Sequence, residues 1–196
     1  MQAFSIIEVM IGMFVFSLGL ISIYALLASS LNVNSYSRNA IVASQLAREQ
    51  IEYIYNLRDG NYENLRVWNL VSPWNFFEAW NYYKAYQNAS YEIVLDNITP
   101  STWFFPEGQD KLSEMGDMAY SWYRVCLNGN IYEYCLNALS WQIPTDFYKY
   151  IFVEQALDEI WNPIVDAFLI HSKVIWYKRG YYEYDIKTII TDWRRI

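Results

Sequence analysis

The feature that most constrains this chain is a long uncharged segment close to its N-terminus. Between Glu8 and Arg38, 29 consecutive residues carry no charged side chain, and most of them are apolar. A helix of about 20 apolar residues is long enough to cross the hydrocarbon core of a bilayer. Such a segment cannot form the surface of a soluble domain. We therefore expect a helix that lies in a membrane or in an apolar assembly.

The helical pattern continues beyond the uncharged segment but becomes one-sided. Apolar residues then recur close to every 3.6 residues, at Ala40, Ala43, Ala47, Ile51, Ile54 and Leu57. The pair Asp59–Gly60 supplies a stop signal. The sequence therefore predicts one helix from about Phe4 to Arg58, loosened at most near Gly19. Its first half suits lipid or a helix bundle, and its second half suits packing on a domain.

A short motif at the start of the helix resembles a known signature. The stretch Ala3-Phe4-Ser5-Ile6-Ile7-Glu8-Val9 is similar to the processing and methylation site of type IV prepilins and the related pseudopilins. In that family a small residue, usually Gly, precedes an aromatic residue that becomes the new N-terminus, and Glu stands at the fifth mature position. Phe4 and Glu8 have this spacing, and Ala3 stands in the place of Gly.

Two further stretches resemble a minor-pilin subgroup of the same family. The run Gln45–Glu52, followed by Asn56–Asp59, is similar to the end of that subgroup's helix. The run Lys187–Trp193 is similar to its last strand. The resemblance is strongest over about the first 60 residues of the chain.

The resemblance implies a route from membrane to filament. A prepilin peptidase would cut between Ala3 and Phe4, and the new Phe4 amine would be methylated. Before assembly the chain would sit in the cytoplasmic (inner) membrane with its C-terminal domain exported. After assembly by a pilus assembly platform it would belong to an extracellular filament at the cell surface. Its partners would be other pilin subunits, in a homopolymer or a heteropolymer.

Glu8 is the residue to which we assign a specific role. A lone carboxylate inside a membrane helix costs about 2.5–3.5 kcal/mol unless a partner neutralises it. The resemblance supplies that partner, the freed amine of Phe4 in a neighbouring subunit. Opposite charges attract strongly in a medium of low dielectric constant, so this pair would fix the axial register between subunits.

These observations divide the chain into four parts. We expect residues 1–3 to be a leader remnant, as the resemblance implies, and residues 4–35 to be the transmembrane or filament-core half of the helix. We expect residues 36–60 to be its amphipathic half and residues 61–196 to form an exported globular β domain. One long helix followed by consecutive strands predicts an α+β fold, with an antiparallel sheet packed on the second half of the helix, as in pilins.

Six stretches of the β domain are expected to be strands because they are rich in Tyr, Ile and Val. They are Tyr91–Asp96, Tyr120–Leu127, Ile131–Leu136, Phe147–Val153, Ser172–Lys178 and Tyr182–Thr191. The pair Arg179–Gly180 predicts a hairpin turn between the last two. We also expect a short helix near Phe77–Tyr86 and a helical insert at Glu154–Phe168, broken at Pro163.

The two cysteines, Cys126 and Cys135, give conflicting signals. An even number of cysteines is compatible with an oxidising compartment, which favours a disulfide. The intervening Asn128–Gly129 is typical of a two-residue hairpin turn, which would place Cys126 opposite Ile131. Cys135 would then lie about 13 Å further along its strand, too far for a bond. We predict the disulfide, which then requires a break in this regular pairing.

Composition and motifs argue against several functional classes. The formal net charge is −7 and the isoelectric point is near 4.7, whereas nucleic-acid binding depends on clustered Lys and Arg. His171 is the only histidine and is expected at the surface or at a sheet edge, with no set of metal ligands around it. We find no arrangement of residues typical of catalysis or cofactor binding. We therefore expect no enzymatic activity, no cofactor and no metal.

The leading hypothesis is a structural subunit of a type IV pilus or a related filament. One alternative is a pseudopilin of a machine similar to type II secretion, with the same processing. Another is a membrane-anchored domain that never polymerises and uses its aromatic residues for surface contact.

Overall fold

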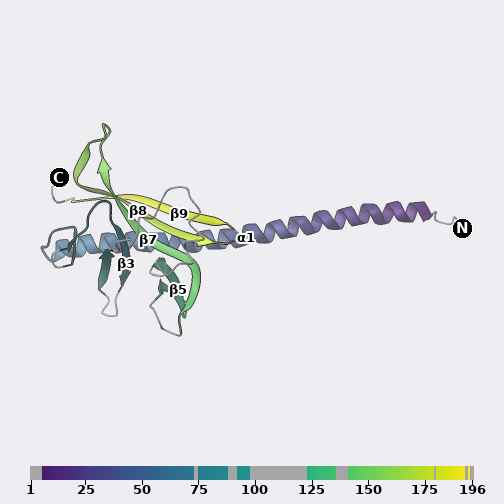
Figure 1. The fold of residues 1–196 in the computed structure, drawn as a ribbon, viewed down its shortest axis with the longest axis horizontal. Coiled ribbons are helices and arrows are strands. Elements are labelled where there is room, and N and C mark those ends of the chain that lie inside the picture. Colours follow the sequence, from purple (N-terminus) through teal and green to yellow (C-terminus); the bar gives the residue numbers. More distant parts are fainter. Residues whose placement is uncertain are drawn as a thin grey trace. The chain divides into compact units, whose positions relative to one another are not determined.

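The computed structural model describes residues 6–72, 75–87, 92–97, 123–135, 141–178, 180–192 and 194. Within this part of the chain one helix is followed by strands (Figure 1). The elements are α1 (Ile6–Glu63), β1 (Leu70–Ser72), β2 (Asn75–Phe76), β3 (Tyr82–Gln87), β4 (Ile93–Asn97), β5 (Arg124–Asn128), β6 (Ile131–Tyr134), β7 (Ile143–Leu157), β8 (Pro163–Tyr177) and β9 (Tyr181–Thr191). The predicted α+β class, one long helix and then an antiparallel sheet, is confirmed.

The chain divides into two compact units, Met1–Ile41 and Val42–Ile196. The described part of the first unit is the beginning of α1, which is helical at every residue from Ile6 and is not loosened at Gly19. Ser17 and Ser22 donate their hydroxyls to the carbonyls of Met13 and Leu18, at 2.8 and 2.9 Å. These bonds satisfy the hydroxyls within the helix, as an apolar environment requires.

In the second unit, α1 continues past the predicted stop at Asp59–Gly60 and ends at Glu63. Tertiary contacts explain the extra turn. The side chain of Asn61 is buried and donates to the carbonyls of Trp68 and Leu70 at 3.1 and 2.7 Å. These bonds hold the last turn of the helix against the chain that follows it, and they override the local preference of Gly60.

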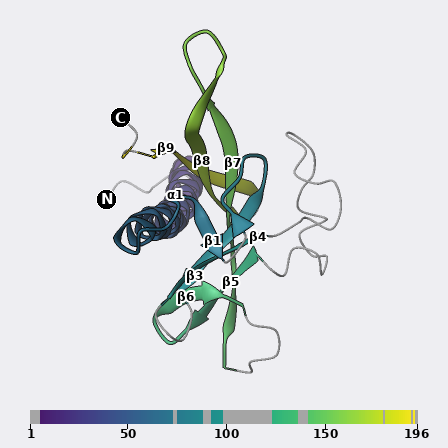
Figure 2. The ribbon, with the colours of Figure 1, turned by 90° about the vertical axis from the view of Figure 1, so that its left-hand side faces the viewer.

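The main sheet of the second unit has seven antiparallel strands arranged around β7 (Figure 2). β8 pairs along one edge of β7, and β9 pairs with β8. The other edge of β7 is shared, because β3 pairs with its second half and β5 with its first half. β4 pairs with the free edge of β3, and β6 pairs with the free edge of β5. β1 and β2 form a separate two-stranded sheet.

Each of the six predicted strand stretches overlaps a strand, although Tyr91, residues 120–122 and Leu136 lie outside the described residues. Both predicted helices of the β domain are wrong. β3 begins at Tyr82, where Tyr82 pairs with Phe152, so no helix spans residues 77–86. The segment 154–168 is a hairpin between β7 and β8 instead of a helix. Pro163 is the first residue of β8, a position where a strand tolerates a missing backbone N–H. Backbone pairing across the sheet therefore outweighs local helical preference in both segments.

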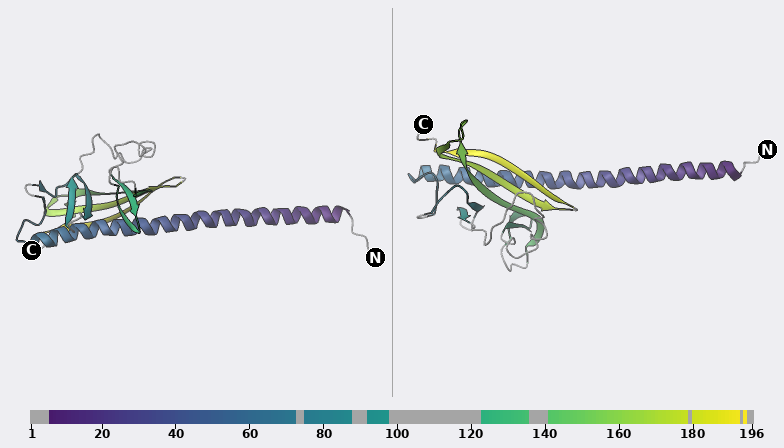
Figure 3. Two further views of the ribbon diagram at one scale, coloured as in Figure 1. Left: turned by 90° about the horizontal axis from the view of Figure 1, so that it is seen from below. Right: turned by 45° about the horizontal axis from the view of Figure 1, so that its top comes forward.

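The core of the second unit lies between the second part of α1 and one face of the sheet (Figure 3). Alternate residues of the strands point towards the helix, as the period of two requires. The buried cluster consists of Ile54, Tyr62, Trp68, Phe77, Tyr83, Ala85, Leu95, Ile151, Val153, Ile170 and Ile190. From the predicted helical stripe, Ala43, Ala47 and Ile54 are buried, and Ala40, Ile51 and Leu57 are half-buried.

Candidate assembly segment and its supporting domain

The candidate assembly segment is the uncharged part of α1, residues 9–37. Its large apolar side chains are exposed, among them Phe14, Phe16, Ile21, Leu26 and Leu31. The helix is long and apolar enough to cross a membrane, and its most apolar stretch is not buried. A contiguous apolar surface of this extent far exceeds what a soluble monomer leaves exposed, which is a few hundred Å². The segment therefore requires lipid or other apolar helices around it.

Glu8 lies in the first turn of α1, just before this segment, and is exposed. The unpaired backbone N–H groups at a helix N-terminus favour an anion there. Ala3 and Phe4, the predicted processing site, lie outside the described residues. Cleavage, methylation and the pairing of Glu8 with the Phe4 amine therefore stay predictions.

In the second unit, α1 is fixed to the sheet by a buried polar cluster around Gln50. Gln50 Nε2 donates to Ser172 Oγ at 2.8 Å, and Ser172 Oγ donates to the carbonyl of Ala47 at 2.8 Å. Gln50 and Ser172 are both fully buried. Because polar groups out of water must find partners, this arrangement fixes the rotation and the axial position of the helix on β8.

A buried cation forms the second part of this junction. Lys149 on β7 is 1% exposed, and its Nζ lies 3.2 Å from Glu49 Oε2 on α1 and 4.9 Å from the centre of the Tyr134 ring. Burial lowers the pKa of Lys149, and the charge of Glu49 partly offsets that effect. Burial, followed by the Glu49 charge, raises the pKa of Tyr134 well above its usual value. Glu49 and the Tyr134 ring therefore offset part of the free energy that burial of the Lys149 charge costs.

This junction was not predicted from the sequence. Gln50 lies four residues before Ile54 and three after Ala47, so it occupies the apolar stripe of the helix. A polar residue at such a position is a signal that a buried partner exists. The sequence alone does not reveal that the partner is Ser172, more than a hundred residues away.

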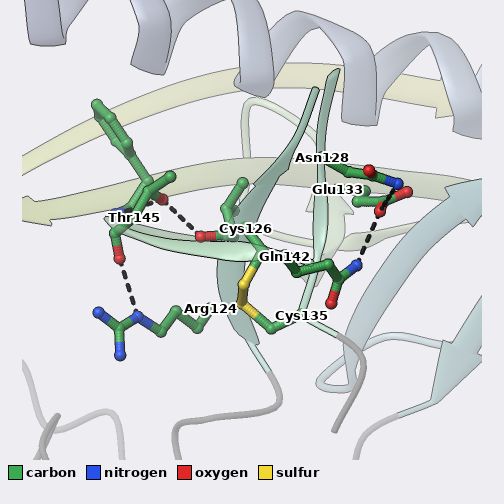
Figure 4. Close-up of a disulfide and its surroundings, with 9 residues drawn as sticks. Arg124, Cys126, Asn128, Glu133, Cys135, Gln142 and Thr145 are labelled. Atoms are coloured by element: carbon green, nitrogen blue, oxygen red, sulfur yellow. Dashed lines mark hydrogen bonds between the residues drawn. A yellow bond between two sulfur atoms is a disulfide. The ribbon is translucent and has the colours of Figure 1, made fainter. Parts of the chain in front are cut away.

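Cys126 and Cys135 form a disulfide on β5 and at the end of β6, with 5.0 Å between their Cα atoms (Figure 4). The predicted register of this hairpin is wrong. Asn128 pairs with Ile131, so the two-residue loop is Gly129 and Asn130, not Asn128 and Gly129.

The conformation of Gly129 explains the correction to the hairpin. Its φ is 60°, while Asn130 is not among the residues with positive φ, which is typical of a loop with glycine at its first position. Cys126 therefore faces Glu133 instead of Ile131. The backbone N–H of Cys135 donates to the carbonyl of Arg124 at 3.0 Å, which brings Cys135 diagonally next to Cys126.

The prediction that His171 lies at the surface or at a sheet edge is also wrong. His171 is 5% exposed and lies on β8, between β7 and β9. Its Nδ1 lies 3.1 Å from Asp185 Oδ2, and its Nε2 lies 3.3 Å from Glu154 Oε2 without hydrogen-bond alignment. Within the described residues, no group of three or more His, Cys, Asp or Glu side chains is arranged to hold a metal ion.

No protein-family model matches this chain, and neither a search of curated proteins nor a search of solved structures finds a match. The arguments for function therefore rest on the residues and their geometry. They start from a long apolar N-terminal helix, suited to membrane association, and an antiparallel sheet that packs on its second part.

Proposed function

We propose that this chain is a structural subunit of a type IV pilus or a related filament, assembled through the first part of α1. The observation that carries the proposal is the candidate assembly segment, 29 uncharged residues that are helical and almost entirely exposed. The pilin-like signature at Ala3, Phe4 and Glu8 supports a filament over a simple membrane anchor. The α+β architecture is consistent with a pilin fold.

The proposed assembly step transfers the apolar segment from lipid to a bundle of identical or related helices. Helix packing between small and large apolar side chains then replaces contact with lipid. Glu8 makes the arrangement specific, because its carboxylate pairs with the Phe4 amine of a neighbouring subunit. Each of these charges is costly alone in an apolar medium, so only the register that joins them is stable.

In this proposal the second unit is the head that the filament displays. The core of the second unit is formed by its own part of α1 and its own sheet, so the second unit does not need the apolar segment in order to fold. The Cys126–Cys135 disulfide suits an oxidising compartment outside the cytoplasm. The subunit would pass from the inner membrane to the cell surface after cleavage by a prepilin peptidase and transfer to the assembly platform.

The test is to shear filaments from cells that express the full chain and to measure the intact mass of the subunit in them. We expect the chain in the sheared fraction, with a mass that starts at Phe4 and includes one added methyl group. A processed chain found only in short periplasmic assemblies would favour the pseudopilin. A chain confined to the membrane that retains Met1 would contradict the proposal and favour a membrane-anchored binding domain.

A further inference from the structure

His171 is the only histidine of the chain, and it is buried on β8, the middle one of three adjacent strands. It lies directly opposite Phe152 of β7 on one side and Lys187 of β9 on the other. Ser172, the next residue of β8, contacts α1. Because successive side chains of a strand point to opposite faces, His171 points to the face of the sheet that is turned away from the helix.

Two carboxylates flank the imidazole ring, one from each neighbouring strand. Nδ1 lies 3.1 Å from Oδ2 of Asp185 on β9, and Nε2 lies 3.3 Å from Oε2 of Glu154 on β7. The side chains of Asp185 and Glu154 are 20% and 35% exposed, so both keep some contact with water. The buried ring therefore faces an acidic oxygen at each of its two nitrogens.

A neutral ring cannot satisfy both of these contacts. A neutral imidazole has one N–H group and one nitrogen lone pair, whereas an imidazolium has two N–H groups. In the neutral form, one ring nitrogen turns its lone pair towards a carboxylate oxygen, which can only accept. Within the described residues, Nε2 of His171 and Oδ1 of Asp185 are both buried without a hydrogen-bond partner. Such atoms are uncommon and costly, and protonation gives Nε2 a hydrogen to donate to Glu154.

Two lysines lie on the same face of the sheet as the ring. Lys187 is opposite His171 on β9 and is exposed, so water and salt screen its charge. Lys173, two residues further along β8, is paired with Glu183 of β9 at 2.8 Å. These cations therefore offset only a small part of the attraction between the two flanking carboxylates and a protonated ring.

The neighbouring tyrosines on this face add no charge near neutral pH. Burial raises the pKa values of Tyr82 on β3 and Tyr150 on β7. Burial of the His171 ring opposes its protonation, because a charged group loses water there. Two carboxylates in direct contact with the ring favour protonation, and the Phe152 ring, whose centre is 5.9 Å from that of His171, is adjacent. The geometry is thus suited to the imidazolium form.

We infer that His171, Glu154 and Asp185 form a pH-sensitive clamp across β7, β8 and β9. The imidazolium donates to both carboxylates at once, so one side chain of β8 holds both neighbouring strands. Loss of the proton removes one of these contacts and leaves a lone pair opposite a carboxylate. β9 is then held less firmly, because its only pairing within the described residues is with β8. The clamp lies within the second unit, so it acts whether or not the chain assembles into a filament.

The direction of the pH effect follows from where the contacts exist. The unfolded chain lacks them, so the proton on His171 stabilises the folded chain. This stabilisation is complete below about pH 6.5, where a histidine in the unfolded chain is also protonated, and it is lost as pH rises. Histidine is the only type of side chain that ordinarily titrates between pH 6 and 8. Because the chain has a single histidine, the effect can be assigned to it.

The first test is urea unfolding of the full chain in detergent at pH 6 and at pH 8. We expect the unfolding equilibrium constant of the second unit to be about tenfold larger at pH 8. In His171→Gln, which keeps a polar side chain that does not titrate, the change should be less than about twofold. A wild-type stability that is equal at the two pH values would overturn the clamp, and so would a tenfold change that persists in His171→Gln.

A matched pair of carboxylate variants tests the contact itself. Glu154→Gln should lose most of the pH effect, because the ring then has one charged partner instead of two. Glu159→Gln, an exposed carboxylate between β7 and β8, should keep the effect in full. Equal behaviour of the two variants would show that the overall charge, and not the contact with His171, sets the pH dependence, and it would overturn the clamp.

The second test reads the protonation state of the ring directly and needs only the wild-type chain. Nitrogen-15 spectra of a single imidazole distinguish a ring with two N–H groups from a ring with one. At pH 7, where an ordinary histidine with a pKa near 6.5 is about one quarter protonated, we expect two N–H groups in most molecules. This result decides the question even if His171→Gln does not fold. A ring that is mostly neutral at pH 7 would overturn the inference.

Discussion

The two parts of α1 belong to one helix but differ in what surrounds them. Residues 42–63 bury Ala43, Leu46, Ala47 and Ile54 against the sheet of the second unit. Residues 6–41 keep their large apolar side chains exposed. The first of these environments is supplied by the chain itself, and the second has to come from outside it.

This difference shows how one helix can serve two purposes. In residues 42–63 the chain uses a narrow stripe and a few buried polar residues, which specify a single partner surface. In residues 9–37 it uses an apolar surface on all sides, which is compatible with lipid and with neighbouring helices. A subunit that moves from a membrane into a filament needs this second, less specific type of surface.

Removal of the apolar segment should produce the largest change. A chain beginning at Tyr36 should be soluble and monomeric, whereas the full chain should require detergent or a filament. The reason is that nearly all of the uncharged apolar residues precede that position. Sedimentation of both chains with and without lipid vesicles measures the effect. A shortened chain that still binds vesicles would show that the second unit has its own affinity for lipid.

Two isoleucines of α1 provide a matched pair. Ile54 is buried in the core of the second unit, and Ile21 is exposed in the apolar segment. Ile54→Ala should lower the free energy of unfolding of the second unit by about 2–5 kcal/mol, because it leaves a cavity. Ile21→Ala should leave it unchanged. Denaturant unfolding of the full chain in detergent, followed by tryptophan fluorescence, measures both effects. Equal losses of stability would contradict the conclusion that only the second part of α1 belongs to the core of the second unit.

Loss of the disulfide should have a somewhat smaller effect, confined to the second unit. The bond closes a short loop, with a sequence separation of 9 between Cys126 and Cys135. Replacement of both by Ala should lower the free energy of unfolding by about 2–3 kcal/mol. Thermal unfolding of the chain that begins at Tyr36 measures this loss. Two thiols that react with an alkylating reagent in unreduced, secreted protein would show instead that the bond is not formed.

The last predicted effect, which is small close to pH 10, is a loss of stability at high pH. Burial raises the pKa values of Tyr134 and Tyr150 in the folded chain. Above pH 10 these tyrosines ionise in the unfolded chain but not in the folded one, so stability falls as pH rises. Each contributes about 1.4 kcal/mol per pH unit in that range.

Lys149 has the opposite effect on the pH dependence of stability. Its lowered pKa means that stability rises with pH between its folded pKa and the unfolded value near 10.5, above which it adds nothing. The two tyrosines therefore dominate above pH 10.5. Urea unfolding at several pH values should show a slope that becomes shallower in Tyr150→Phe. A stability that stays constant between pH 9 and 11 would contradict the burial of these tyrosines.

The sequence was sufficient to predict the elements whose pattern repeats over a long range. The helix follows from its uncharged segment and its apolar stripe, and β9 follows from the run Tyr182–Thr191. These signals are local and regular, so they can be recognised without knowledge of the rest of the fold.

The errors occurred where a distant partner or one turn residue decides the structure. The segment Glu154–Phe168 was predicted as a helical insert, but it is a hairpin whose turn is held by the hydrogen bonds of Asp158. The cysteine register depends on whether Gly129 is the first or the second residue of its turn. The burial of His171 depends on its position between two neighbouring strands, and Glu154 and Asp185 come from those strands. None of this is encoded in local periodicity.

The most direct test of the central claim follows Glu8→Ala in the full chain, with the amounts in membranes and in sheared filaments measured together. We expect the membrane level to hold or rise, because removal of the carboxylate eases insertion by about 2.5–3.5 kcal/mol. Filament content should fall strongly, because the Phe4 amine of the neighbour would lose its partner at a cost of about 3–5 kcal/mol. Glu52→Ala, an exposed carboxylate on the same helix, should change neither amount. Equal filament content for wild type and Glu8→Ala would contradict assembly through this pair.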